Sequence, residues 1–172
     1  MSIFKRLFAR KRQKDEAAAQ LYRRIVEQAR LPEFYESLGV PDSVEGRFDL
    51  LALHAFLVME ALSPTEPEGA QALFDLMFDD LESNLRELGA SDIRIGARVK
   101  KLAQDFLGRS HAYRTALENQ DDSLLMAALD RNVFAKAAST PLALQTLAHY
   151  TRRCRAAQET ANAQFPPIEM AT

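Results

Sequence analysis

Apolar residues recur along most of this chain at alternating steps of three and four, which is the spacing of an α-helix with one buried face. The clearest stripe runs through residues 44–62, where it includes Val44, Phe48, Leu51, Ala55, Val58 and Leu62. A second apolar face at positions 50, 53 and 57 shares that segment. Since a helix that is apolar on more than one side is normally buried, the pattern predicts a central helix here.

The same spacing predicts five more helices, and the residues between them are typical of helix ends. They are expected at 19–30, at 70–88, from the cap at 90–92 to 117, after 121–123, and from the Thr140-Pro141 pair to 161. No alternating β-branched run flanked by turn residues is present, so strands are not expected. The sequence therefore predicts an all-α, single-domain bundle of about six helices over 15–164, with a basic amphipathic segment at 1–14 and a flexible tail at 165–172.

Charge is divided unevenly along the chain. The 172 residues carry a formal net charge of −2, but residues 1–14 contain six basic and no acidic side chains, which leaves −8 for the rest. Such a division is typical of a basic tail with its own partner attached to an acidic body.

The basic segment also carries large apolar side chains. Ile3, Phe4, Leu7 and Phe8 fall on one helical side, with Lys5, Arg6, Arg10, Lys11 and Arg12 around and after them. Bulky apolar residues beside a polybasic run suit an anionic membrane surface, where each basic charge contributes about 1 kcal/mol. A disordered basic tail is one alternative, and a segment that binds nucleic acid or the ribosome is another.

Three classes of protein are disfavoured by simple features. The one cysteine, Cys154, excludes an intrachain disulfide and a multi-cysteine zinc site, and it lies on an apolar stripe, as a buried inert thiol would. No apolar stretch of signal-peptide length follows the N-terminal charges. The longest apolar run, 50–59, is far shorter than the roughly 20 residues of a membrane span, and it contains His54. His54 is expected to be a core histidine with a hydrogen-bond partner.

The stretch FDDLE, at 78–82, raises the question of a metal site. Asp75, Asp79 and Glu82 share one face of the predicted helix at steps of four and three. However, Ser83 stands where the third acid of an aspartate-rich magnesium motif would fall, and no second acidic cluster at ligand spacing occurs. A solvated or partner-binding acidic face is therefore favoured over a metal-dependent helical enzyme.

Arg109 interrupts the apolar stripe of its predicted helix. A charge at a core position must be paired or reach solvent, because burying it unpaired costs several kcal/mol. We expect an internal ion pair with an acid of the 70–88 helix, and a direct contact with a partner is the alternative.

The two helices around these residues resemble one protein family. F-D-x-x-F-D-D-x-E at 74–82, L-R-E-L-G at 85–89, V-K-K at 99–101 and F-x-G-R-x-x-x-Y at 106–113 stand in the order and spacing of the ubiquinol–cytochrome c chaperones. RFDLLALHAFLV at 47–58 is similar to the histidine-bearing helix that precedes them, although this chain lacks the family's usual tryptophan before that helix. The resemblance covers about residues 33–120.

The resemblance implies an α-helical chaperone, with no catalytic residues and no cofactor, that binds newly made cytochrome b during assembly of the bc1 complex. It implies a place in the bacterial cytoplasm, peripheral on the cytoplasmic face of the inner membrane, with the ribosome as a further candidate partner and no specific DNA or small-molecule substrate. Partner contacts are expected at Phe74, Asp75, Phe78, Asp79, Glu82, Arg109 and Tyr113.

Overall fold

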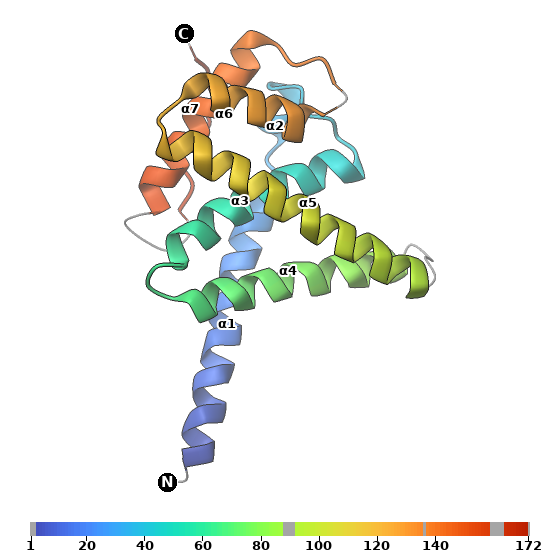
Figure 1. The fold of residues 1–172 in the computed structure, drawn as a ribbon, viewed down its shortest axis with the longest axis vertical. Helices are drawn as coiled ribbons and strands as arrows, with labels where there is room; N and C mark the ends of the chain where they lie inside the picture. The colour runs from blue at the N-terminus through green and yellow to red at the C-terminus, as the bar shows by residue number, and fades with distance from the viewer. Residues whose placement is uncertain (1–2, 88–91, 136, 159–163, 172) are drawn as a thin grey trace.

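A computed structural model describes residues 3–87, 92–135, 137–158 and 164–171, with the backbone alone for 3–12 and 92–93. Its described elements are helices without any strand: α1 (Ile3–Ala29), α2 (Pro32–Glu36), α3 (Val44–Leu62), α4 (Pro67–Glu87), α5 (Asp92–Glu118), α6 (Asp122–Leu129), a π-helical turn (Asp130–Phe134) and α7 (Pro141–Gln158). The predicted all-α bundle is confirmed, with α2 as a single turn beside six longer helices (Figure 1).

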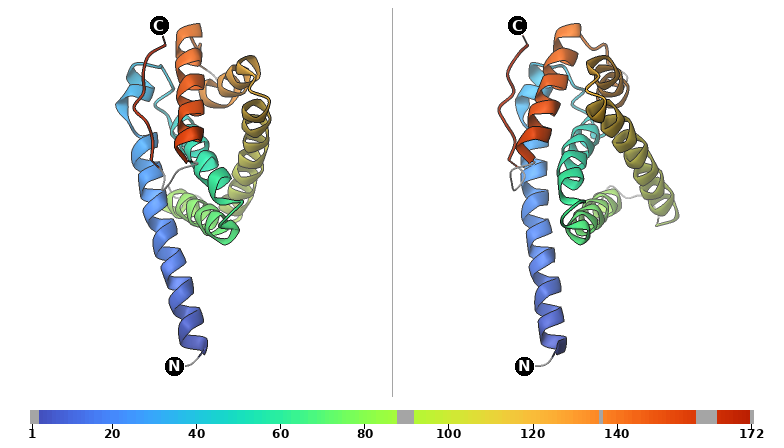
Figure 2. Two further views of the ribbon diagram at one scale, coloured as in Figure 1. Left: turned by 90° about the vertical axis from the view of Figure 1, so that its left-hand side faces the viewer. Right: turned by 60° about the vertical axis from the view of Figure 1, so that its left-hand side comes forward.

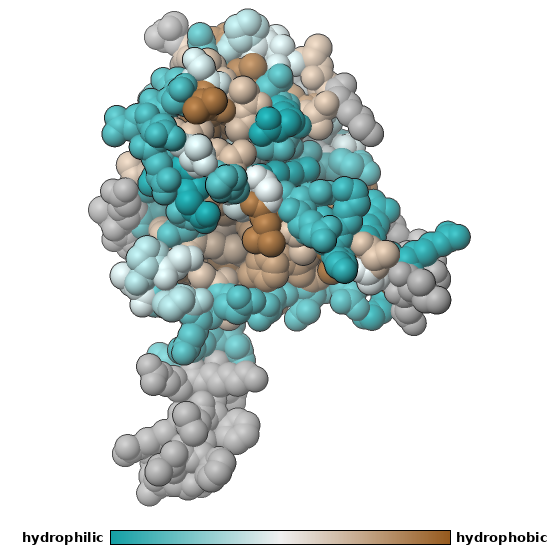
Figure 3. Space-filling view, viewed as in Figure 1, coloured by the Kyte–Doolittle hydropathy of each residue, from teal (hydrophilic) through white to brown (hydrophobic). Residues whose placement is uncertain are grey.

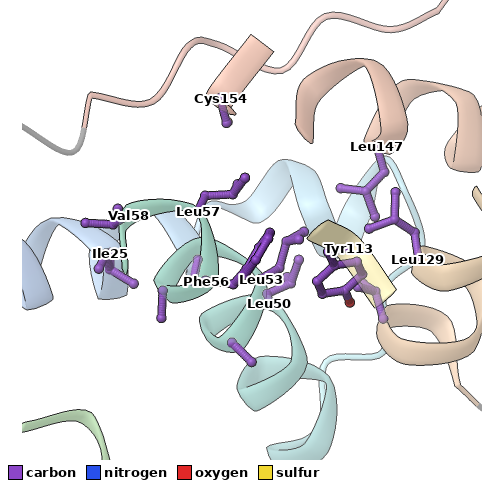
Figure 4. Close-up of a cluster of buried hydrophobic side chains, with 14 of the residues drawn as sticks. Ile25, Leu50, Leu53, Phe56, Leu57, Val58, Tyr113, Leu129, Leu147 and Cys154 are labelled. Atoms are coloured by element: carbon purple, nitrogen blue, oxygen red, sulfur yellow. The ribbon is translucent and has the colours of Figure 1, made fainter. Parts of the chain in front are cut away.

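α3 is the central helix, as predicted. It contacts α1, α4, α5, α7 and the π-helical turn, and twelve of its nineteen residues are buried. Ser43 caps its first turn by accepting a hydrogen bond from the Gly46 amide at 3.1 Å. Gly46 is required there, since a Cβ at this position would lie 2.0 Å from the Pro41 carbonyl oxygen. Figure 4 shows side chains of α1, α5, α6 and α7, including Ile25, Tyr113, Leu129 and Leu147, gathered around those of α3.

His54 joins three helices in this core. Its Nδ1 lies 2.7 Å from the Leu50 carbonyl oxygen, which can only accept, so Nδ1 carries the proton and donates. Nε2 therefore accepts from the Tyr150 hydroxyl of α7 at 2.8 Å, and that hydroxyl accepts from Gln28 of α1 at 2.9 Å. The prediction of a hydrogen-bonded core histidine is confirmed. Burial lowers the pKa of His54 to about 4, against the hydrogen bond to Leu50, which acts to raise it.

Cys154 is fully buried on α7, as predicted for an inert thiol. Burial raises the pKa of its sulfhydryl to about 12, so the thiolate is disfavoured at neutral pH.

Both ends of the chain differ from the prediction. The sequence predicts a separate basic segment before a helix at 19–30, whereas one continuous α-helix spans Ile3–Ala29 and its first half projects beyond the body (Figures 1 and 2). The predicted flexible tail instead packs along α7. Phe165 meets the His54 ring edge-on at 5.1 Å, Ile168 packs on the core, and Glu169 pairs with Arg153 at 2.7 Å. These contacts order a segment that has no helical periodicity of its own.

The neutral state of His54 predicts a specific acid sensitivity. The unfolded chain takes up a proton at His54 near pH 6.5, and the folded chain does so only near pH 4. Stability from this group is therefore present above about pH 6.5 and is lost as pH falls toward about 4, by up to about 3 kcal/mol. We expect His54→Gln, which keeps hydrogen-bonding groups but cannot titrate, to have a shallower loss of unfolding free energy across that window. If unfolding free energy fell equally with pH in the native protein and in the variant, His54 would not be the group responsible for the acid sensitivity.

Candidate partner-binding surface on α4 and the adjoining groove

α4 carries an acidic face that is open to solvent. Asp75 and Asp79 are exposed, and Glu82 is half-buried on the same side. Asp75 accepts a hydrogen bond from Gln71 at 2.7 Å, and Glu82 forms an ion pair with Arg86 at 2.5 Å. Both partners, Gln71 and Arg86, belong to α4 itself. The three predicted acids lie together on one face of this helix. In the described part of the chain, no three His, Cys, Asp or Glu side chains are grouped as a metal ion would require.

Two predicted contact residues lie behind this face. Phe78 is 7% exposed and Phe74 is half-buried, and their rings are 4.6 Å apart. Both meet Phe106 of α5, at 5.8 and 6.2 Å between ring centroids. Aromatic rings at these distances attract one another in edge-to-face geometry. Partner contacts were expected at both phenylalanines, but this cluster mainly holds α5 against α4, and of the two rings only that of Phe74 is partly available.

The face of the molecule between α4 and α5 nevertheless exposes apolar surface. Figure 3 shows brown surface in the angle between the two helices, with hydrophilic surface along the outer edge of α4. Leu107 of α5 is 60% exposed. Apolar surface is thus exposed between the two helices, next to the hydrophilic edge of α4.

A groove of about 760 Å³ opens between α1, α3, α4 and α5. Its apolar walls come from all four helices and include Val26, Phe48, Leu51, Leu81, Leu85 and Leu102. At one wall the Tyr22 hydroxyl donates to Asp80 at 2.8 Å, and burial together with this carboxylate raises the pKa of Tyr22. The groove is wide enough for side chains of a bound helix, in the range of ordinary ligand clefts. The sequence did not reveal it, because the groove depends on how the four helices pack against one another in space.

Arg109 lies in the wall of this groove and forms the expected internal ion pair, but with a different partner. Its guanidinium binds Asp49 of α3 and lies over the Phe48 ring, 5.6 Å from the centroid. The prediction of an acid from the 70–88 helix was wrong. Burial raises the pKa of the Asp49 carboxyl, and the charge and hydrogen bond of Arg109 oppose that rise. The signal for Asp49 in the sequence was an acid directly before the longest apolar run, 50–59.

Tyr113, the last of the expected contact residues, is 1% exposed. It packs against Phe56 at 5.6 Å between ring centroids, so it is a core residue rather than part of the surface. The expected membrane-contacting side chains, at positions 3–8 and 10–12, lie outside the side chains that the structure describes. Among the described residues, no helix combines the length and the apolarity needed to cross a bilayer.

Comparison with known proteins identifies relatives over most of the chain. A family model for the ubiquinol-cytochrome C chaperone matches residues 36–164, a range that includes α3 to α7. Ubiquinol-cytochrome-c reductase complex assembly factor 1 of Xenopus laevis is 24% identical over 140 residues, which are 80% of this chain and 70% of that protein. The crystal structure of the Cbp3 homolog from Brucella abortus is 36% identical, with a TM-score of 0.79 over 93% of this chain and 90% of that one.

The Asp49–Arg109 pair predicts a large difference between two arginine substitutions. Arg109→Ala leaves a nearly buried carboxylate without its cation, and we expect the unfolding free energy to fall by about 3 kcal/mol. Arg114→Ala on the same helix removes the more exposed pair with Glu60, and the expected loss is at most about 1 kcal/mol. Urea unfolding of both variants measures the difference, and equal losses would contradict it.

Proposed function

The chain belongs to the ubiquinol–cytochrome c chaperone family, and we propose that it binds newly made cytochrome b at the cytoplasmic face of the bacterial inner membrane during assembly of the bc1 complex. The observation that carries this proposal is the family match over 36–164, because that range contains α4, α5 and most of the groove. The chain acts by binding, as a chaperone, and the proposal involves no catalytic step.

The chemistry of cytochrome b as a nascent membrane protein fits the surface on α4. A membrane segment has an apolar body, and its cytoplasmic flanks are rich in Lys and Arg. The exposed carboxylates of Asp75 and Asp79 complement such a flank, while the groove and the apolar surface beside Leu107 take apolar side chains. A surface that offers both carboxylates and apolar side chains favours a bound segment of mixed character over a purely polar peptide.

The N-terminal residues supply the attachment to the membrane in this proposal. Six basic side chains with no acid among residues 1–14 are attracted to anionic lipid headgroups, and the apolar residues among them insert at the interface. A chaperone held at this surface meets its substrate where the substrate enters the bilayer.

Charge reversal on α4 tests the binding surface. We expect Asp79→Lys with Glu82→Lys to keep the helical circular dichroism of the native protein but to abolish recovery of cytochrome b with the chaperone from membranes. Glu27→Lys with Glu36→Lys is the matched control, since both acids are exposed on α1 and α2 rather than on α4, and the total charge changes equally. Normal recovery with the α4 variant would show that this face is only solvated.

Substitution within the basic segment tests the membrane attachment. Phe4→Ser with Phe8→Ser should weaken sedimentation with vesicles that contain phosphatidylglycerol, because about 2 kcal/mol of apolar transfer free energy is lost per phenylalanine. The melting temperature should not change, since the body forms without these side chains. Undiminished vesicle binding would remove this segment from the proposal, and equally strong binding to RNA with steep salt dependence would favour the ribosome instead.

A further inference from the structure

A second cavity lies toward the end of α3, whereas the groove lies at its start. It has a volume of about 840 Å³ and opens between α1, α3, α5 and α7. We call it the α1–α7 pocket; its lining residues are 17, 20, 21 and 24 of α1, 56–58 and 60–62 of α3, 64–66 of the next loop, 117 of α5, and 155 and 158 of α7. Among the described residues, the two cavities have no lining residue in common, and the proposed function makes no use of this pocket.

The inner wall of the α1–α7 pocket is apolar. Phe56, Leu57 and Val58 of α3, which Figure 4 shows within the core cluster, border the pocket and are buried. Leu117 of α5 is buried beside them, and Leu21 of α1 is half-buried. The volume lies within the range of roughly 300–1,000 Å³ that is usual for small-molecule sites, whose walls are mostly apolar with a few polar groups. An apolar chain therefore suits this wall.

Arg155 of α7 brings a cation without a counter-charge to this wall. Its side chain is half-buried, and among the described residues it has no carboxylate partner. The two neighbouring arginines on α7 differ from it in this respect, because Arg152 pairs with Asp122 at 2.6 Å and Arg153 with Glu169 at 2.7 Å. The N–H donors of the Arg155 guanidinium are therefore available to an anion in the pocket.

The other charges at the pocket leave it net positive. Arg24 of α1 is a second cation in the lining. Of the two acids in the lining, Glu60 is bound by Arg114 through both carboxylate oxygens, at 2.6 and 2.9 Å, and Glu66 is exposed on the loop before α4. With Arg114 included, three cations face two carboxylates, which leaves a net charge of +1 where the body as a whole is acidic.

We propose that the α1–α7 pocket binds an anionic lipid, with an acyl chain against the inner wall and a carboxylate or phosphodiester head at Arg155 and Arg24. Transfer of the chain out of water favours binding at the apolar wall. A guanidinium binds either head through charge-assisted hydrogen bonds, which a neutral head does not offer. This inference goes beyond the proposed chaperone function and does not depend on it, because it concerns a different cavity.

Ligands with the same chain and different heads test the role of charge. The full chain is titrated by calorimetry with oleate, oleoyl-lysophosphatidylglycerol and neutral monoolein, each below its critical micelle concentration. We expect the anions to bind about tenfold more tightly than monoolein, because charge-assisted hydrogen bonds hold only the anionic heads. Arg24→Gln with Arg155→Gln should remove this preference. The matched control, Arg23→Gln with Arg94→Gln, changes two exposed arginines outside the pocket and should keep it.

Tryptophan quenching tests where the chain of the lipid lies. The protein has no native tryptophan, so a single reporter can be placed at Ala17→Trp in the pocket wall or, as the control, at exposed Ala127→Trp on α6. Stearate brominated in the middle of its chain quenches tryptophan only at short range. We expect saturable quenching at position 17, with the affinity that calorimetry gives, and none at position 127.

The outcomes separate the proposal from its alternatives. If neither anion binds, if monoolein binds as tightly as the anions, or if the two tryptophans are quenched equally, the lipid site is wrong. Arg155→Lys, which keeps the positive charge, should retain most of the preference for anions, and its complete loss in that variant would contradict a role for charge. If the site is present, the tighter of the two anions identifies the head as a free carboxylate or a phosphodiester. Recovery of cytochrome b tests the proposed function separately, so each idea can fail while the other stands.

Discussion

α3 has no face that water can reach over most of its length, and the rest of the fold follows from covering it. A helix with apolar residues on every side is stable only when other helices surround it. α1, α4, α5 and α7 all contact it, and the aromatic cluster of Phe74, Phe78 and Phe106 closes the layer on one side by joining α4 to α5. The groove lies where this covering is incomplete, near the start of α3, so the candidate binding surface is a consequence of the same constraint.

Two polar side chains on α3 restrict how its neighbours can be arranged. His54 is satisfied only if Tyr150 of α7 is in place, and Tyr150 in turn accepts from Gln28 of α1. Asp49 is satisfied only if Arg109 of α5 is in place. Neither arrangement adds much net stability, because the cost of removing these groups from water offsets most of what their partners contribute. A misplaced neighbouring helix would leave a buried polar group without a partner, which costs far more. These residues therefore select one register from the many that apolar packing alone allows.

Periodicity in the sequence was sufficient to predict the helices and to identify α3 as the central one, because apolar spacing indicates which side of a helix is buried. It also indicated that Arg109 must be paired. It did not identify Asp49 as the partner, since the two residues are sixty positions apart and the acids of α4 were more numerous. The groove, the burial of Tyr113 and the packing of 164–171 likewise depend on contacts between distant segments. The sequence placed the apolar residues of the basic segment on one helical side, but it did not show that the backbone of 3–13 continues the helix formed by 14–29.

The separation of charge along the chain has a physical consequence for the binding function proposed above. Carboxylates that attract the basic flank of a membrane protein are repelled by the lipid that the same flank prefers. A body with acids alone would stay away from the surface where its substrate emerges, and a body with mixed charges would lose its selectivity for that flank. Placing all the basic charge of the first fourteen residues on one helical extension, and the acids of α4 at its base, keeps both attractions in one molecule without letting them neutralise each other.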